Sequence, residues 1–155
     1  MNAYRAKPSN VPWPPILAAV ALLLAVLAGK LIAVPLPDAA VLRMIGVLLL
    51  LSAVGLDIWS ITTLHSAQTT ILPTRKSSHL VMNGPYRFSR NPIYCGYIMF
   101  LLALGLILAN AWFVAFAAAA AYGIQRFAVE REELHLLAVF GAEYESYCRR
   151  VRRWV

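Results

Sequence analysis

Long apolar runs separated by short polar segments dominate the chain. The first covers about residues 16–34 and the second about 39–64, and each is long enough to cross a bilayer, which takes about 20 residues. A third run, about 93–109, is broken by Asn110 and followed at once by a fourth, about 111–124. Because these last two runs are short for full spans, the pattern predicts a tight helical hairpin whose tip barely reaches the far face of the membrane.

The pattern changes after the fourth run. Over about residues 128–150, apolar side chains recur at three- and four-residue spacing and charged ones mostly occupy the other faces, which indicates an amphipathic helix. The closing Arg152-Arg153-Trp154 suits an anchor among lipid headgroups. The expected fold is therefore all-α: four transmembrane helices, the last two forming the hairpin, and then a cytoplasmic amphipathic helix.

Composition supports a membrane protein. The chain has 155 residues, of which 61% are hydrophobic and 14% charged, whereas soluble domains are about half apolar and about a quarter charged. A soluble fold of this size has too much surface for its volume to hide so many apolar side chains. Lipid must therefore solvate part of the surface.

The charge pattern indicates topology rather than nucleic-acid binding. The net charge of +7 comes mainly from basic residues at the ends of apolar runs, as the positive-inside rule describes. The polar stretch 65–91 contains Arg75, Lys76, Arg87 and Arg90 and no acid, so we expect it in the cytoplasm with both termini. We expect a bacterial inner membrane protein that binds no nucleic acid. The sequence indicates no obligate protein partner.

Two features of the sequence concern single residues. Asp57 lies within the second run, and an acid inside a membrane helix suggests a functional site. Because its position is not deep, an interfacial Asp paired with an Arg of the next loop is the favoured interpretation. Cys95 and Cys148 belong to no CxxC or Cys/His cluster, so we expect no disulfide framework and no metal site.

The polar residues before the hairpin could form a cofactor site. Pro92 suits the first turn of a helix, which puts Arg90 and Asn91 at a helix N-terminus, where backbone N–H groups favour an anion. Tyr86 and Tyr94 add aromatic faces. The segment is therefore compatible with a charged, adenine-bearing cofactor, or with a loop whose basic residues bind lipid headgroups.

A second polar element follows the hairpin on the same side. Glu132 and Glu133 are placed to accept hydrogen bonds from a ribose or an amino group, or to form the solvated acidic first turn of the tail helix. Because the hairpin returns the chain to its starting side, we expect the two polar elements to meet.

Together these motifs resemble the isoprenylcysteine carboxyl methyltransferase family and its relatives among phospholipid methyltransferases. The resemblance covers about half of the chain, and the combination is specific although each piece alone is weak. The matching residues are Gly84-Pro85-Tyr86, Arg90-Asn91-Pro92-Ile93-Tyr94, Glu132-Glu133-His135-Leu136 and Phe140-Gly141-Tyr144-Tyr147.

The resemblance implies a single membrane methyltransferase domain over residues 1–155, with cofactor binding in about 78–155. It implies S-adenosylmethionine as the cofactor and a lipophilic small molecule or lipid as the substrate. The implied cofactor residues are Leu80, Val81, Tyr86, Asn91, Pro92, Tyr94 and Glu132, with Arg90 added for its charge. Arg126 is the nearest candidate for the family's carboxylate-binding Arg, or else a topology anchor, and Glu133 is a candidate base.

One departure affects the mechanism. The family's His between Arg and Pro is Asn91 here, and an amide cannot take up a proton. A carboxylate or thiolate acceptor needs no base, whereas an amine acceptor would need one, such as Glu133 or His135. Two rival functions stay open: an NADPH-dependent membrane reductase and a non-catalytic membrane scaffold.

Overall fold

The computed structural model describes residues 11–37, 39–67 and 80–155. These ranges are helical, and their one β-type contact is an isolated bridge between Pro35 and Asn110. The helices are α1 (Trp13–Leu31), α2 (Ala40–Ser66), the 3-10 helix η2 (Gly84–Arg87), α3 (Pro92–Ile107), α4 (Trp112–Ile124), the π-helix η3 (Gln125–Val129) and α5 (Glu130–Arg150). The all-α architecture is confirmed for this part of the chain.

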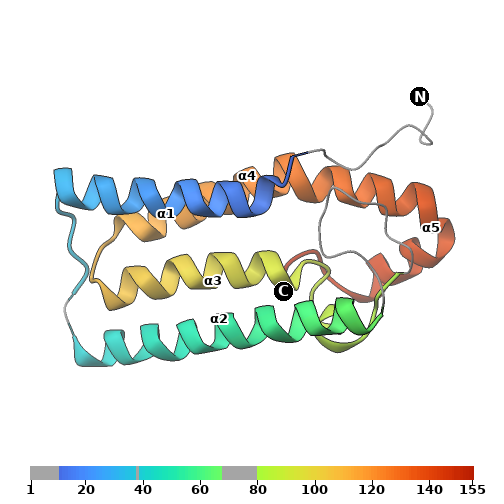
Figure 1. The fold of residues 1–155 in the computed structure, drawn as a ribbon, viewed down its shortest axis with the longest axis horizontal. Helices are drawn as coiled ribbons and strands as arrows, with labels where there is room; N and C mark the ends of the chain where they lie inside the picture. Colours follow the sequence, from blue (N-terminus) through green and yellow to red (C-terminus); the bar gives the residue numbers. More distant parts are fainter. Residues whose placement is uncertain (1–10, 38, 68–79) are drawn as a thin grey trace.

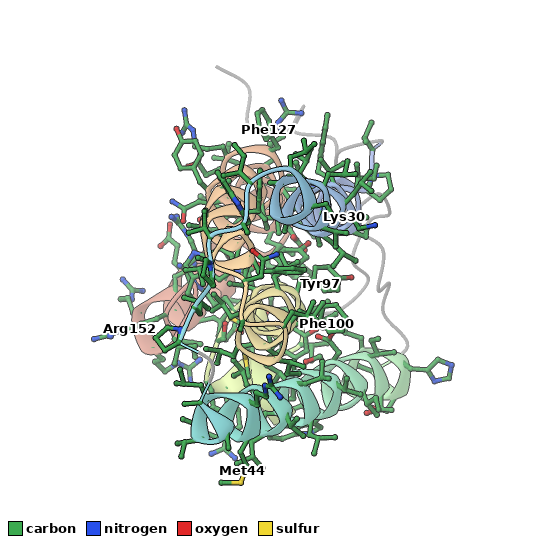
Figure 2. The ribbon with its side chains drawn as sticks, turned by 90° about the vertical axis from the view of Figure 1, so that its left-hand side faces the viewer. Lys30, Met44, Tyr97, Phe100, Phe127 and Arg152 are labelled. Atoms are coloured by element: carbon green, nitrogen blue, oxygen red, sulfur yellow. The ribbon has the colours of Figure 1, made fainter. Side chains whose placement is uncertain are left out.

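Three helices in the described ranges are long and apolar enough to cross a membrane. They are α1, α2 and the continuous helix Trp112–Arg150, which comprises α4, η3 and α5. The apolar α3 is shorter, at 16 residues. Many large apolar side chains of α1 and α2 point outward, such as Met44, which Figure 2 shows directed away from the bundle. A surface of this kind requires lipid as its solvent.

The short helix α3 lies at the centre of the bundle, between α2 on one side and α1 and α4 on the other (Figure 1). Its Leu101 packs with Phe113 of α4 and with Ala21 and Ala25 of α1 in one buried cluster. Small residues at such contacts let membrane helices approach closely, where van der Waals packing replaces the hydrophobic effect.

The two ends of the bundle differ. At one end, backbone bonds tie the segment after α1 to the turn after α3: Leu36 N–H donates to the Ala109 carbonyl at 2.8 Å, and Ala111 N–H donates to the Val34 carbonyl at 2.9 Å. The opposite end carries η2, the start of α3 and all of α5 (Figure 1). The polar elements singled out in the sequence therefore share one end.

The tail helix differs from the prediction in two ways. It does not begin separately near residue 128, because α4 continues through the π-helical turn η3 into α5. It is also bent at Gly141, whose φ of 50° and ψ of −124° are not helical. Residues 1–10, Asp38 and the basic residues Arg75 and Lys76 lie outside the described residues.

The bend makes a prediction about Gly141. A methyl group there meets no atom within 4 Å, but the positive φ disfavours any side chain. We expect Gly141→Ala to destabilise the protein by about 1–3 kcal/mol. Gly55→Ala, which adds a methyl group in open space within α2, is the matched control and should be neutral or slightly stabilising. Thermal unfolding in detergent measures both, and equal midpoints would contradict the bend.

Candidate functional site

Two segments distant in sequence meet through one hydrogen bond. The hydroxyl of Tyr94, in the first turn of α3, donates to Glu132 Oε2, in the first turn of α5, at 3.0 Å. Tyr94 is buried in a cluster with Ile124 and Val129, which belong to the α4–η3 stretch. The structure thus brings together one predicted site residue from each of the two polar elements.

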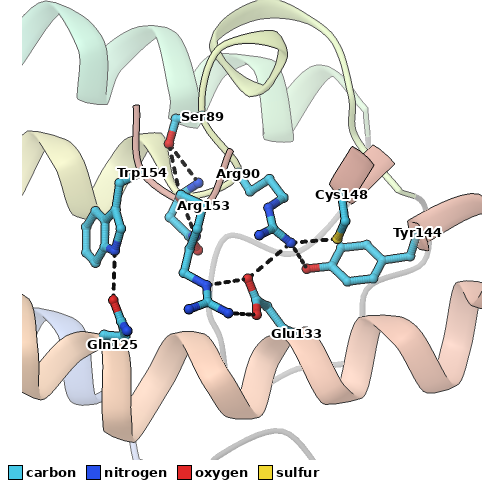
Figure 3. Close-up of polar contacts among 9 residues, drawn as sticks. Ser89, Arg90, Gln125, Glu133, Tyr144, Cys148, Arg153 and Trp154 are labelled. Atoms are coloured by element: carbon cyan, nitrogen blue, oxygen red, sulfur yellow. Dashed lines mark hydrogen bonds and ion pairs between the residues drawn. The ribbon is translucent and has the colours of Figure 1, made fainter. Parts of the chain in front are cut away.

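The neighbouring Glu133 points to a different set of partners. Arg153 donates from Nε to Oε1 at 2.9 Å and from Nη2 to Oε2 at 2.6 Å, and Arg90 Nη1 lies 3.1 Å from Oε1 (Figure 3). Paired guanidinium bonds of this kind are among the stronger polar contacts in proteins. The bond to Glu133 raises the pKa of Arg153 above its usual value. Both oxygens of Glu133 are therefore occupied by arginine donors.

Arg90 extends this cluster toward the second half of α5. Its Nη1 also lies 2.6 Å from Cys148 Sγ and 3.4 Å from the Tyr144 hydroxyl (Figure 3). Its Nε is buried without a hydrogen-bond partner among the described residues. Arg90, predicted to favour an anion at the α3 N-terminus, is thus held by protein groups from two sides.

The last residues of the chain lie across the start of α3. Arg90 N–H donates to the Arg152 carbonyl at 3.0 Å, and the Asn91 side-chain amide donates to the Arg153 carbonyl at 2.9 Å. Trp154 Nε1 donates to Gln125 Oε1 at 3.0 Å (Figure 3). The polar groups of Arg153 and Trp154 thus bond back to the protein, and their role as a headgroup anchor stays a prediction.

Sequence reasoning missed Arg153, Trp154 and Gln125 as parts of this site. Arg153 and Trp154 lie beyond the last helix, and none of the three belongs to the motifs. The one available signal was charge: Glu132 and Glu133 are acidic and the chain end is basic. This signal does not identify which ion pairs form, because the pairing depends on how the backbone turns after Arg150.

Tyr86, in η2, is a buried residue near the interface of the two polar elements. Its carbonyl accepts a hydrogen bond from the Tyr147 hydroxyl at 2.7 Å. Burial raises the pKa of Tyr86 well above its usual value, and the charges of Glu132, Tyr147 and Asp57 raise it further. Tyr86 is therefore close enough to both Glu132 and Asp57 to feel their charge.

The remaining predicted residues fall into two groups. Pro92 is buried beside the cluster, and Leu80 and Val81 are half-buried where the described chain resumes. Arg126 lies apart: its side chain is 55% exposed and pairs with Glu130 at 2.8 Å, one turn along the same helix. His135 is buried.

A cavity of about 530 Å³ opens between the two halves of α5, which the bend at Gly141 folds toward each other. This volume is in the range of small-molecule pockets. Its lining residues are Arg90, Glu130, Glu133, Leu134, Leu137, Tyr144, Glu145, Cys148 and Arg149. Tyr86, Asn91, Tyr94 and Glu132 are not among them. No cluster of metal-ligating side chains occurs within the described ranges.

Two of the three ion pairs among the described residues should differ in their effect on stability. We expect Arg153→Met to destabilise the protein by about 1.5–3 kcal/mol, because it leaves the partly buried Glu133 without its paired donor. Arg126→Met removes an exposed pair and should cost less than about 1 kcal/mol. Thermal unfolding in detergent compares the two, and limited proteolysis should release the chain end in the Arg153 variant only. An equal effect of both substitutions would contradict a stabilising role for the paired contacts of Glu133 with arginine.

Comparison with known proteins identifies the family. A model of the phospholipid methyltransferase family matches residues 41–143, well over half of the chain, from α2 to the second half of α5. Searches of curated proteins and of solved structures gave no match. The match confirms the resemblance found in the motifs. The chain belongs to the phospholipid methyltransferase family, a family of methyltransferases that act on membrane substrates.

Proposed function

We propose that the protein is an S-adenosylmethionine-dependent methyltransferase that acts on a lipophilic substrate dissolved in the membrane. The observation that carries the proposal is the Tyr94–Glu132 hydrogen bond at 3.0 Å, which joins the two motif segments at one end of the bundle. The family match supports methyl transfer, and the apolar surface of α1 and α2 supports a membrane setting.

The chemistry of Glu132 fits this cofactor. Within the described residues, ion pairs involve Glu130 and Glu133 but not Glu132, whose hydrogen bond comes from a neutral phenol. A partly buried carboxylate without a cation attracts a positively charged ligand. S-adenosylmethionine carries a sulfonium, an ammonium and ribose hydroxyls, all of which suit such an acceptor. Tyr86 and Tyr94 add faces for its cation or its adenine.

We propose that cofactor binding involves eight residues of the two motif segments. They are Leu80, Val81, Tyr86, Arg90, Asn91, Pro92, Tyr94 and Glu132. Arg152 and Arg153 lie across the same N-terminus, where their carbonyls accept from Arg90 and Asn91. The cofactor-binding part spans about residues 78–155 of one domain.

S-adenosylmethionine supplies a methyl group already activated by its sulfonium, so the protein's contribution is alignment and exclusion of water. The contacts of Glu133 support a positioning role, because its carboxylate fixes the Arg90 guanidinium beside the cavity. Arg126 stays a candidate for contact with an anionic acceptor, although its exposed pairing with Glu130 equally supports an anchor at the membrane surface.

For the membrane arrangement, we propose four crossings, with α3 and α4 as a hairpin and both termini in the cytoplasm. The antiparallel course of α3 and α4 and the shared location of η2, the start of α3 and α5 support this topology (Figure 1).

A cofactor titration tests the proposal. Detergent-purified protein should bind S-adenosylmethionine saturably by isothermal calorimetry. Glu132→Gln and Tyr94→Phe should each weaken binding by about tenfold, because the first removes the negative charge proposed to attract the cofactor and the second removes the hydroxyl that donates to Glu132. Glu143→Gln, an exposed acid on the same helix, is the matched control and should bind like the wild type.

The outcomes separate the rival functions. NADPH binding without S-adenosylmethionine binding would indicate the reductase, and binding of neither would indicate the scaffold. Wild-type affinity in both Glu132→Gln and Tyr94→Phe would show that the cofactor site lies elsewhere.

Topology has its own test. A cysteine-reactive, membrane-impermeant label should reach cysteines introduced at residues 2 and 155 only from the cytoplasmic side of sealed vesicles. Labelling of the two ends from opposite sides would refute the even number of crossings.

A further inference from the structure

The end of the chain lies between the two motif segments. The helix α5 ends at Arg150, and extended backbone at Val151, with φ of −125° and ψ of 131°, takes the chain out of the helix. The following residues contact the start of α3 on one side and the α4–α5 helix on the other, and Figure 3 shows the side chains of Arg153 and Trp154 directed toward that helix. We call residues 152–154 the strap.

The strap occupies hydrogen-bond donors at the N-terminus of α3. The Arg152 carbonyl accepts from the Arg90 N–H at 3.0 Å, and the Arg153 carbonyl accepts from the Asn91 side-chain amide at 2.9 Å. Donors at a helix N-terminus also suit an anion. S-adenosylmethionine carries an anionic amino-acid carboxylate, which requires donors of this kind. The strap carbonyls and that carboxylate therefore compete for the same groups.

Trp154 brings the strap close to the Tyr94–Glu132 hydrogen bond. Its indole packs against the buried cluster that contains Tyr94, and its Nε1 donates to Gln125 Oε1 at 3.0 Å. Tyr94 is the donor of the hydrogen bond to Glu132 that joins the two motif segments. A ligand that comes between Tyr94 and Glu132 must therefore share this region with the Trp154 side chain.

The strap is held in place by few contacts. Its strongest is the paired bond of Arg153 to Glu133, at 2.9 and 2.6 Å, and the Arg153 side chain is still 35% exposed. The strap begins only one residue after α5, so its local concentration at these contacts is on the order of millimolar. A few contacts are therefore enough to keep the strap bound, and the loss of one shifts the balance toward release.

We propose that the strap is an autoinhibitory segment, which the cofactor must displace from the N-terminus of α3 before it binds. This inference rests on the proposed function and adds control of cofactor access to the same site. Only molecules with a released strap have the Arg90 and Asn91 donors free. The measured Kd of the cofactor is therefore the intrinsic Kd divided by the released fraction.

Substitutions that loosen the strap test the proposal in the full chain. Arg153→Met removes the paired bond to Glu133 and should lower the Kd of S-adenosylmethionine by about tenfold, as expected if the strap is bound in about nine of ten wild-type molecules. Arg152→Met removes the same charge from an exposed side chain and keeps the backbone carbonyl, so its Kd should match that of the wild type. Isothermal calorimetry in detergent measures all three proteins.

A second variant separates strap release from charge and from a folding defect. Trp154→Phe removes the hydrogen bond to Gln125 without changing any charge, and it should lower the Kd by about threefold. Thermal unfolding of each variant shows that the bundle is folded at the temperature of the titration.

Limited proteolysis of the wild type gives a readout that does not depend on affinity. Trypsin cleaves after arginine, so it removes residues from the chain end when the strap is released. Saturating S-adenosylmethionine should accelerate this removal, as followed by mass spectrometry, because the bound cofactor keeps the strap displaced.

Each contrary result has a separate meaning. Protection of the chain end by S-adenosylmethionine would show that the strap closes over the cofactor, and it would overturn autoinhibition while leaving the methyltransferase proposal intact. Unchanged or weaker binding in both Arg153→Met and Trp154→Phe would overturn it in the same way. Failure of the wild type and of both variants to bind S-adenosylmethionine would overturn the proposed function itself.

Discussion

The carboxylate of Glu133 is the contact on which the cytoplasm-facing site, as proposed, depends. It binds Arg90 at the start of α3 and Arg153 near the chain end. It therefore joins three segments that are separate in the sequence. Because Arg153 is fixed, its carbonyl is positioned to accept from Asn91. The arrangement around the α3 N-terminus therefore follows from one acid and two bases.

The two consecutive glutamates have different partners because of helix geometry. Successive residues on a helix point about 100° apart, so Glu132 and Glu133 cannot face the same partner. Glu132 meets the phenol of Tyr94, and Glu133 meets the two guanidinium groups. Glu133 is thereby paired with two cations, whereas Glu132 meets only a neutral phenol. The same motif thus places an ion-paired carboxylate next to one that has no cation among the described residues.

The sequence was sufficient for the broad architecture and for the meeting of the two polar elements. Long apolar runs require lipid, and a helical return between segments 80–94 and 132–144 places both at one end. The π-turn at η3 and the bend at Gly141 were not predictable, because each depends on local backbone geometry that leaves the apolar period almost unchanged. The contacts of Arg153 and Trp154 were missed for another reason: they depend on how the chain turns after α5, and residues outside a regular element carry no periodic signal.

Asp57 illustrates what a structure adds to a residue already noticed in a sequence. Its position in an apolar run left two interpretations, an interfacial ion pair or a functional acid. The decisive feature is on the other helix, where Gly96 removes the side chain that would otherwise meet the carboxylate. A structural ion pair would be expected to bring a base to this contact, yet the described residues bring none: α3 contributes Gly96, with Cys95 and Tyr97 nearby. An ion pair within the described residues therefore does not account for the place of Asp57 at the α2–α3 contact.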